Sequence, residues 1–177
     1  MPNRKTNRVV RATALLFGEG RDDRMFLAYL VSIYAAGQDL RRPKISTKKG
    51  RGGSADGVVQ DAHKLPGSYS RKLVKLDKDR PQEEIDEATR IAQRHKIQIV
   101  FSMPCIEGTL LNILEPGTNY ANKSSQTCKR TFESRYISTA NRGKMSEYVR
   151  WFTKDLLDEA RQRVPELNEL ITYIESC

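Results

Sequence analysis

The chain has 177 residues, a formal net charge of +9 and a sequence pI near 9.6. Its hydrophobic content of 38% is enough to build a core, while a mean hydropathy of −0.63 predicts a strongly charged exterior. This length favours one domain with a small appendage, and the surplus of positive charge favours an anionic partner, nucleic acid first.

Several protein classes are disfavoured by the same sequence. The three cysteines (Cys105, Cys128 and Cys177) are far apart and form no Cys-x-x-Cys pair, so neither a zinc site nor a disulfide scaffold is indicated. No apolar run approaches the roughly 20 residues of a membrane-spanning helix, and the basic N-terminus shows no small-residue cleavage site. We therefore expect a cytoplasmic protein with reduced thiols and no membrane partner.

Strand-like and helix-like segments alternate along the first two thirds of the chain. Apolar runs predict strands at 9–17, 43–46, 72–76 and 97–101. Helical spacing of apolar residues predicts helices that begin near Asp22, Ala55 and Pro81, and a further apolar stretch covers 110–114. This alternation predicts an α/β domain with a largely parallel sheet.

The last third of the chain has a different pattern of residues. Residues 115–144 are rich in Asn, Ser and basic side chains, which predicts a loop with one short helix facing the anionic partner. Apolar residues at helical spacing predict one amphipathic helix over 149–160 and another that starts at Pro165. We expect residues 1–115 to form the α/β domain, with the basic loop and helices of 116–177 packed on it. Packing of the last helices on a partner protein stays open.

Carboxylates follow three of the predicted strands. Glu19 and Asp77 come directly after strands, and Glu107 lies a few residues past another. Ligands of parallel α/β sheets bind beyond the carboxyl ends of the strands, so these acids are expected at one edge. Asp77 and Asp79 would point the same way if the chain stays extended between them.

Crowded carboxylates repel one another, and a hard cation with oxygen ligands removes that repulsion. The pattern therefore predicts a divalent-metal site held by Glu19, Asp77 and Asp79. The alternative is a solvated loop whose aspartates cap the helix opened by Pro81. For Asp23, a helix cap is an equally good interpretation.

Basic residues in two stretches are candidates for phosphate binding. A Gly-rich segment, Thr47–Ser54, precedes a predicted helix but lacks the P-loop pattern, so a mobile surface loop is an equal alternative. The second stretch is 123–144. From the two we select as nucleic-acid-binding candidates Lys48, Lys49, Arg51, Lys129, Arg130 and Lys144.

Three motifs in this order resemble the TOPRIM domain, the fold of topoisomerases, primases and the OLD and RloB-like nucleases. The motifs are Gly18-Glu19-Gly20-Arg21-Asp22-Asp23, then Asp77-Lys78-Asp79, then Ser102-Met103-Pro104-Cys105-Ile106-Glu107. The third is similar to the Ser-Asn-Pro-Cys-Phe-Glu segment of RloB-like proteins. The resemblance covers residues 9–115 and implies a Rossmann-like, mostly parallel four-stranded sheet flanked by helices, followed by a C-terminal helical extension.

The resemblance also implies roles for single residues. Glu19 matches the catalytic glutamate, Asp77 and Asp79 match the metal-binding Asp-x-Asp, and all three are expected to be catalytic. Asp23 and Glu107 match further acidic positions, which completes a Mg²⁺ or Mn²⁺ ligand set of Glu19, Asp77, Asp79, Asp23 and Glu107. The chain departs from the pattern at three places: Asp22 replaces a Thr, Met103 replaces an Asn, and Gly108-Thr109 stand where an aromatic is common.

The function expected from this resemblance is metal-dependent hydrolysis of DNA or RNA, as an effector of a defence or restriction system with an ATPase partner. One alternative is a non-catalytic TOPRIM-like subunit that binds nucleic acid or an ATPase. Another is a phosphatase or phospho-receiver, because Asp-x-Asp at a strand end also serves phosphoryl transfer; its placement after a later strand disfavours this. The sequence leaves open whether the chain forms a homo-oligomer.

Overall fold

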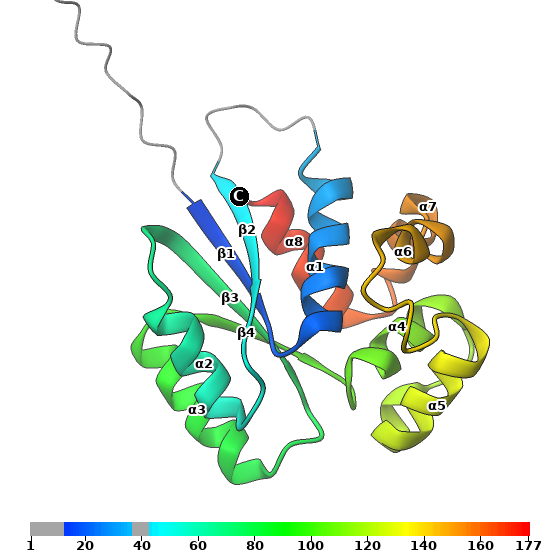
Figure 1. Cartoon of the computed structure of the whole chain (residues 1–177), viewed down its shortest axis with the longest axis horizontal. Coiled ribbons are helices and arrows are strands. Elements are labelled where there is room, and N and C mark those ends of the chain that lie inside the picture. The colour runs from blue at the N-terminus through cyan, green and yellow to red at the C-terminus, as the bar shows by residue number, and fades with distance from the viewer. Residues whose placement is uncertain (1–12, 37–42) are drawn as a thin grey trace, which may run out of the picture.

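The structure, a computed structural model, describes residues 13–36 and 43–177. Four strands form one sheet in the order β2-β1-β3-β4, and every neighbouring pair is parallel (Figure 1). The strands are β1 (Thr13–Gly18), β2 (Lys44–Lys49), β3 (Tyr69–Asp77) and β4 (Gln98–Ser102). The predicted α/β class, with a parallel four-stranded sheet, flanking helices and a C-terminal helical part, is confirmed. Residues 9–12 of the first predicted strand lie outside the described residues.

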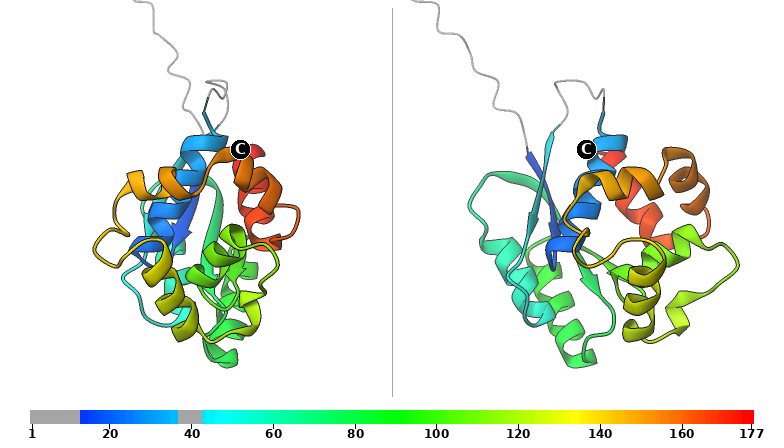
Figure 2. Two further views of the ribbon diagram at one scale, coloured as in Figure 1. Left: turned by 90° about the vertical axis from the view of Figure 1, so that its right-hand side faces the viewer. Right: turned by 45° about the vertical axis from the view of Figure 1, so that its right-hand side comes forward.

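The two faces of the sheet carry different helices (Figures 1 and 2). Helices α2 (Ala55–Lys64) and α3 (Gln82–Arg94) cover one face, while α1 (Arg21–Tyr34) and α8 (Pro165–Glu175) cover the other. Side chains along β1 alternate between the two cores: Leu15 and Phe17 join one, Ala14 and Leu16 the other. Because both faces are covered, this strand reads as a continuous apolar run.

Strand β2 extends beyond the predicted segment. Lys48 and Lys49 were expected in a loop, but they pair with Phe17 and Gly18 at the end of β1. An edge strand exposes part of its length to water, so its lysines carry no apolar signal. The Gly-rich loop is therefore shorter than expected and covers Gly50–Ser54.

The C-terminal part, which the structure describes in full, contains helices joined by turns and loops, and no strand. Its elements are α4 (Ile106–Leu114), a 3₁₀ turn η1 (Tyr120–Asn122), α5 (Ser125–Arg135), α6 (Met145–Trp151) and α7 (Lys154–Ala160), followed by α8. The single helix predicted over 149–160 is wrong. The Thr153 side chain accepts a hydrogen bond from the Leu156 N–H and starts a new helix there, so α6 and α7 are separate.

The C-terminal helices share a core with the sheet. The Phe26 ring of α1 lies 6.2 Å from that of Tyr148 and 5.6 Å from that of Phe152. The Tyr173 hydroxyl of α8 donates to the Leu15 carbonyl at 3.2 Å, inside the sheet. Among the described residues, no helix combines the length and the apolar character needed to cross a bilayer.

The strand order fixes where a ligand site is expected. The chain goes from β1 outward to β2, returns to the other side of β1 as β3, and continues to β4. The direction of winding therefore reverses between β1 and β3. In open α/β sheets, ligands bind at such a switch point, just beyond the carboxyl ends of the two strands.

Candidate functional site

A pocket of about 660 Å³ lies at the carboxyl edge of the sheet. Its wall combines the turn after β1 and the start of α1, the end of β2 with its loop, and the last residue of β3 with residues of α4, α5 and the loop before α6. Glu19, Asp77 and Glu107 contribute carboxylates, and Lys49, Arg51 and Lys129 contribute cations. The switch point between β1 and β3 thus carries both charge types in one hollow.

Glu19 and Asp77 lie side by side there. Glu19 directly follows β1 and is 9% exposed, and its Oε2 accepts a bond from the Asp77 N–H at 3.4 Å. Its other oxygen pairs with the guanidinium of Arg80, whose side chain is 29% exposed. From the sequence we expect the fold to bring Glu19 close to Asp77, and the structure does so.

A buried lysine joins Asp77 to Asp23. Lys75 on β3 is 1% exposed, and its Nζ lies 2.5 Å from Asp23 Oδ1 and also contacts Asp77 Oδ1. The second oxygen of Asp23 accepts the Gly20 N–H at 2.8 Å, which caps the start of α1. Burial disfavours the charge on Lys75, but the two carboxylates outweigh it and raise its pKa, so the lysine stays an ammonium ion.

Lys75 was missed in the sequence because it lies inside an apolar run. Its signal was present: a lysine between Val74 and Leu76 in a strand expected to be covered on both faces. A lysine is almost never fully buried unless it is paired. Such a residue therefore calls for a carboxylate partner.

Gly18 explains how close Asp23 comes to β1. A Cβ built on Gly18 would lie 2.4 Å from the Asp23 Cβ and 3.0 Å from the Arg24 nitrogen. No side chain fits in that space, so only glycine allows the first turn of α1 to press against the strand end. That contact helps to bring the Asp23 carboxylate to Lys75.

On the other side of the pocket, Arg142 binds two acids. Its Nη1 lies 2.6 Å from Glu107 Oε1 and 3.3 Å from Asp22 Oδ2. Arg142 is 8% exposed, whereas the sequence placed it among residues facing the partner. Glu107 Oε2 and Arg142 Nε are buried without a hydrogen-bond partner among the described residues.

Asp79 does not follow the extended geometry that the sequence argument required. The chain turns at Lys78, and the N–H groups of Lys78 and Asp79 both donate to the Pro104 carbonyl at 3.0 Å. Asp79 is exposed and lines an adjoining hollow of about 320 Å³, together with Glu19 and Asp77. It therefore lies at the solvent side of the pair formed by Glu19 and Asp77.

These groups offer few free ligands for a divalent cation. Across the described ranges 13–36 and 43–177, no three His, Cys, Asp or Glu side chains form a ready-made metal cluster. Mg²⁺ usually needs only one or two carboxylates, with waters and substrate phosphates completing its shell. Asp23 is bound by Lys75 and Glu107 by Arg142, so neither carboxylate is available as it stands. Glu19 could hold an ion only if Arg80 turned away, and Asp77 only through Oδ2, because Lys75 contacts its Oδ1.

The predicted basic residues divide into two groups. Lys49, Arg51 and Lys129 line the pocket, the first two from β2 and its loop and the third from α5. Lys48, Arg130 and Lys144 are exposed but do not form its wall. Of the six residues, the first group alone is placed to contact a ligand inside this pocket.

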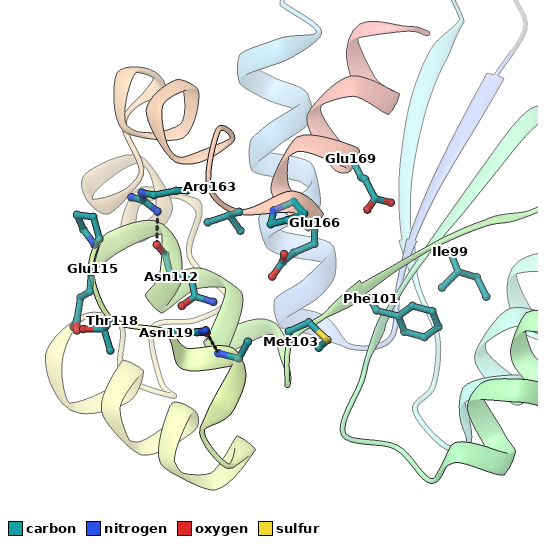
Figure 3. Close-up of a pocket in the computed structure, with 15 residues that line it drawn as sticks. Ile99, Phe101, Met103, Asn112, Glu115, Thr118, Asn119, Arg163, Glu166 and Glu169 are labelled. Atoms are coloured by element: carbon teal, nitrogen blue, oxygen red, sulfur yellow. Dashed lines mark hydrogen bonds between the residues drawn. The ribbon is translucent and has the colours of Figure 1, made fainter.

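A second hollow of about 700 Å³ lies beside the edge strand β4, away from these charges (Figure 3). Two of its charged groups already have structural partners: Arg163 donates to the carbonyls of Asn112 and Ile113 at the end of α4, and Glu166 accepts from Thr109 at 2.8 Å. Though slightly larger, it is not the candidate site, because it lies away from the switch point.

No protein-family model, no curated protein and no solved structure matches this chain. The assignment of a role to the pocket therefore rests on its own geometry and on the motif resemblance.

Proposed function

We propose that this chain is a metal-dependent nuclease of the TOPRIM type, which hydrolyses DNA or RNA at the pocket between β1 and β3. The observation that carries the proposal is that the Glu19 carboxylate accepts a hydrogen bond from the Asp77 backbone N–H at the topological switch point, which places both acids in one pocket with basic residues. A phosphodiester is anionic, so it needs cations to bind and oxygen ligands to hold the metal that activates it.

Each residue then has a defined part. Lys49, Arg51 and Lys129 bind the phosphates and neutralise the charge that develops on them. Glu19 and Asp77 would hold Mg²⁺ or Mn²⁺, with Asp79 available from the solvent side. The chemistry that the ion supplies when bound is polarisation of the phosphodiester and activation of water.

The resemblance to RloB-like proteins supports a place for this chain in a defence or restriction system, with an ATPase as partner. Co-expression with ATPases encoded beside the gene, followed by size-exclusion chromatography, tests this part. Separate elution of the chain and each ATPase would contradict it.

The catalytic proposal is tested by cleavage of labelled single- and double-stranded DNA and RNA in the presence of Mn²⁺ or Mg²⁺. We expect Glu19→Gln and Asp77→Asn each to lower the rate at least ~100-fold, because each removes an oxygen that the metal or the proton transfer needs. Glu87→Gln is the matched control, since Glu87 pairs with Arg90 on the exposed side of α3, away from the pocket. Cleavage by both site variants at the wild-type rate would remove the assigned site.

Nucleic-acid binding is tested separately from cleavage. Lys129→Ala should reduce the slope of log K against log salt by roughly 0.7–0.9, the value of one lost phosphate contact. Lys144→Ala is the control, because Lys144 is equally basic and exposed but bonds Asn141 and does not line the pocket. Equal slopes for both variants would place the phosphates elsewhere.

A second candidate function is a non-catalytic subunit that binds nucleic acid or an ATPase. The ion pairs favour it, because Lys75, Arg80 and Arg142 already neutralise carboxylates that a metal would otherwise use. In that case Lys129→Ala would still weaken binding, while Glu19→Gln would change neither binding nor any cellular phenotype.

A further inference from the structure

We propose that the Lys75 ammonium permanently takes the place of one divalent cation among these carboxylates, so that the pocket takes a single cation, at Glu19 and Asp77. The second half of this inference rests on the proposed function. The first half concerns the folded chain alone and stands on the geometry of Lys75, Asp23 and Asp77.

The oxygens around Lys75 leave little room for a second ion. Its Nζ contacts Oδ1 of Asp23 and Oδ1 of Asp77, and Gly20 N–H occupies Oδ2 of Asp23. Only Oδ2 of Asp77 has no hydrogen-bond partner among the described residues. A cation bound between the two aspartates would have to displace the ammonium.

Lys75 and Arg80 differ in how easily they can leave. Lys75 is 1% exposed and lies inside the strand, so moving its charge would open the core around it. The Arg80 side chain is 29% exposed and approaches Glu19 beside the smaller hollow, so it can turn into solvent. We infer that Arg80 exchanges with a metal ion, while Lys75 does not.

The charge balance agrees with one ion. Two aspartates around one ammonium carry a net charge of −1, and Glu19 adds another negative charge when Arg80 withdraws. One divalent cation compensates both. Two such ions would leave an excess of positive charge in a half-buried space, which is unfavourable.

The test compares wild type with Lys75→Met, a side chain of similar length without the charge. In EDTA, Lys75→Met should melt roughly 10 °C lower, because the buried carboxylate of Asp23 and the partly buried one of Asp77 lose their counter-ion. Mn²⁺ should then raise its melting temperature more than that of wild type. Titration of Mn²⁺, followed by the electron paramagnetic resonance of the free ion, should give one ion per wild-type chain and two per variant chain.

Lys72→Met is the matched control. Lys72 lies on the same strand, but its Nζ donates to the carbonyls of Ala62 and His63 and binds no carboxylate in the described part of the chain. The control should change neither the number of ions bound nor the gain in stability on adding Mn²⁺. A change equal to that of Lys75→Met would overturn the inference.

If Lys75→Met fails to fold without metal, the double variant Asp23→Asn/Lys75→Met decides the matter. Removal of one negative charge together with the positive charge should restore folding in EDTA and return the count to one ion per chain. An unchanged ion count in Lys75→Met, or no rescue in the double variant, contradicts the inference.

Cleavage is not among these readouts, so the two proposals fail separately. A wild-type chain that binds no Mn²⁺, beside a Lys75→Met chain that gains an ion, would sink the nuclease function but keep Lys75 as the substitute cation. If wild type cleaves nucleic acid but Lys75→Met behaves like Lys72→Met, the nuclease function stands and the role of Lys75 as a substitute cation is contradicted.

Discussion

Two charge clusters flank the pocket, and they differ in how completely their polar atoms are paired. In the lysine cluster (Asp23, Lys75 and Asp77), the ammonium binds both acids and the strand and first helix hold all three side chains. In the arginine cluster (Asp22, Glu107 and Arg142), Glu107 Oε2 and Arg142 Nε are buried without partners among the described residues. A buried polar atom without a partner costs free energy until something binds it.

The elements behind each cluster explain this difference. The lysine cluster belongs to β3, which is paired with β1 in the sheet, and to α1, which packs on the face of that sheet. The arginine cluster connects α1 and α4 to the loop of Arg142, which lies between α5 and α6. We therefore expect the arginine side of the pocket to adjust when a ligand enters and the lysine side to stay fixed.

The largest expected effect on the stability of either cluster comes from Arg142→Met. The change leaves the carboxylate of Glu107 buried without its counter-ion, so the free energy of unfolding should fall by about 3–5 kcal/mol. Urea denaturation at neutral pH measures it. Arg90→Met, which breaks an exposed pair on α3, should cost less than about 1 kcal/mol.

A double variant sharpens the same comparison. Glu107→Met/Arg142→Met removes both charges from the buried pair, and such a replacement is often close to neutral. We expect most of the lost stability to return. A double variant as unstable as Arg142→Met would show that packing, rather than the stranded charge, causes the loss.

A smaller effect on stability is expected from Glu115, whose carboxylate binds α5 and the residue after it. Burial raises the pKa of Glu115, but hydrogen bonds from Tyr120, Tyr136 and Arg135 outweigh it and hold this pKa below its ordinary value of 4.5. A carboxyl whose pKa is lower in the folded state adds stability above pH 4.5, and this contribution is lost as the pH falls through the folded value. Glu115→Gln should therefore cost up to about 1 kcal/mol at pH 7 and flatten the decline below pH 4.5.

Melting temperatures measured from pH 7 to pH 3 test this prediction. Because Glu115 holds α5 and α4 together, the loss should appear on the helical side of the pocket, as faster hydrogen exchange in α5 than in β3. Parallel pH profiles for wild type and variant would contradict the assignment.

The order of strands and helices could be predicted because each element buries a face with its own period. The end of β2 was missed because Lys48 and Lys49 lie at an exposed edge, where no apolar signal is required. The break between α6 and α7 was missed because the apolar spacing of 149–160 runs on across it, and only the cap at Thr153 marks it.

Part of the candidate site could likewise be predicted from the sequence, and part could not. That Glu19 and Asp77 meet follows from the rule for parallel sheets, which needs only the ends of the strands. The clusters could not be predicted, because no comparable rule says which acid meets a lysine inside a strand or an arginine in a loop: Lys75 binds Asp23, 52 residues away, and Arg142 binds Glu107, 35 residues away. The sequence shows that a buried lysine needs an acid, but not which acid it meets.

Gly18 has a consequence for any mutational scan of this chain. The contact between its Cα and the first turn of α1 leaves no room for a methyl group, and the turn carries the acid that neutralises Lys75. Even alanine at this position would separate two opposite charges without altering either of them. In such a scan, substitution of Gly18 should therefore lower stability as much as substitution of the ionised residues around it.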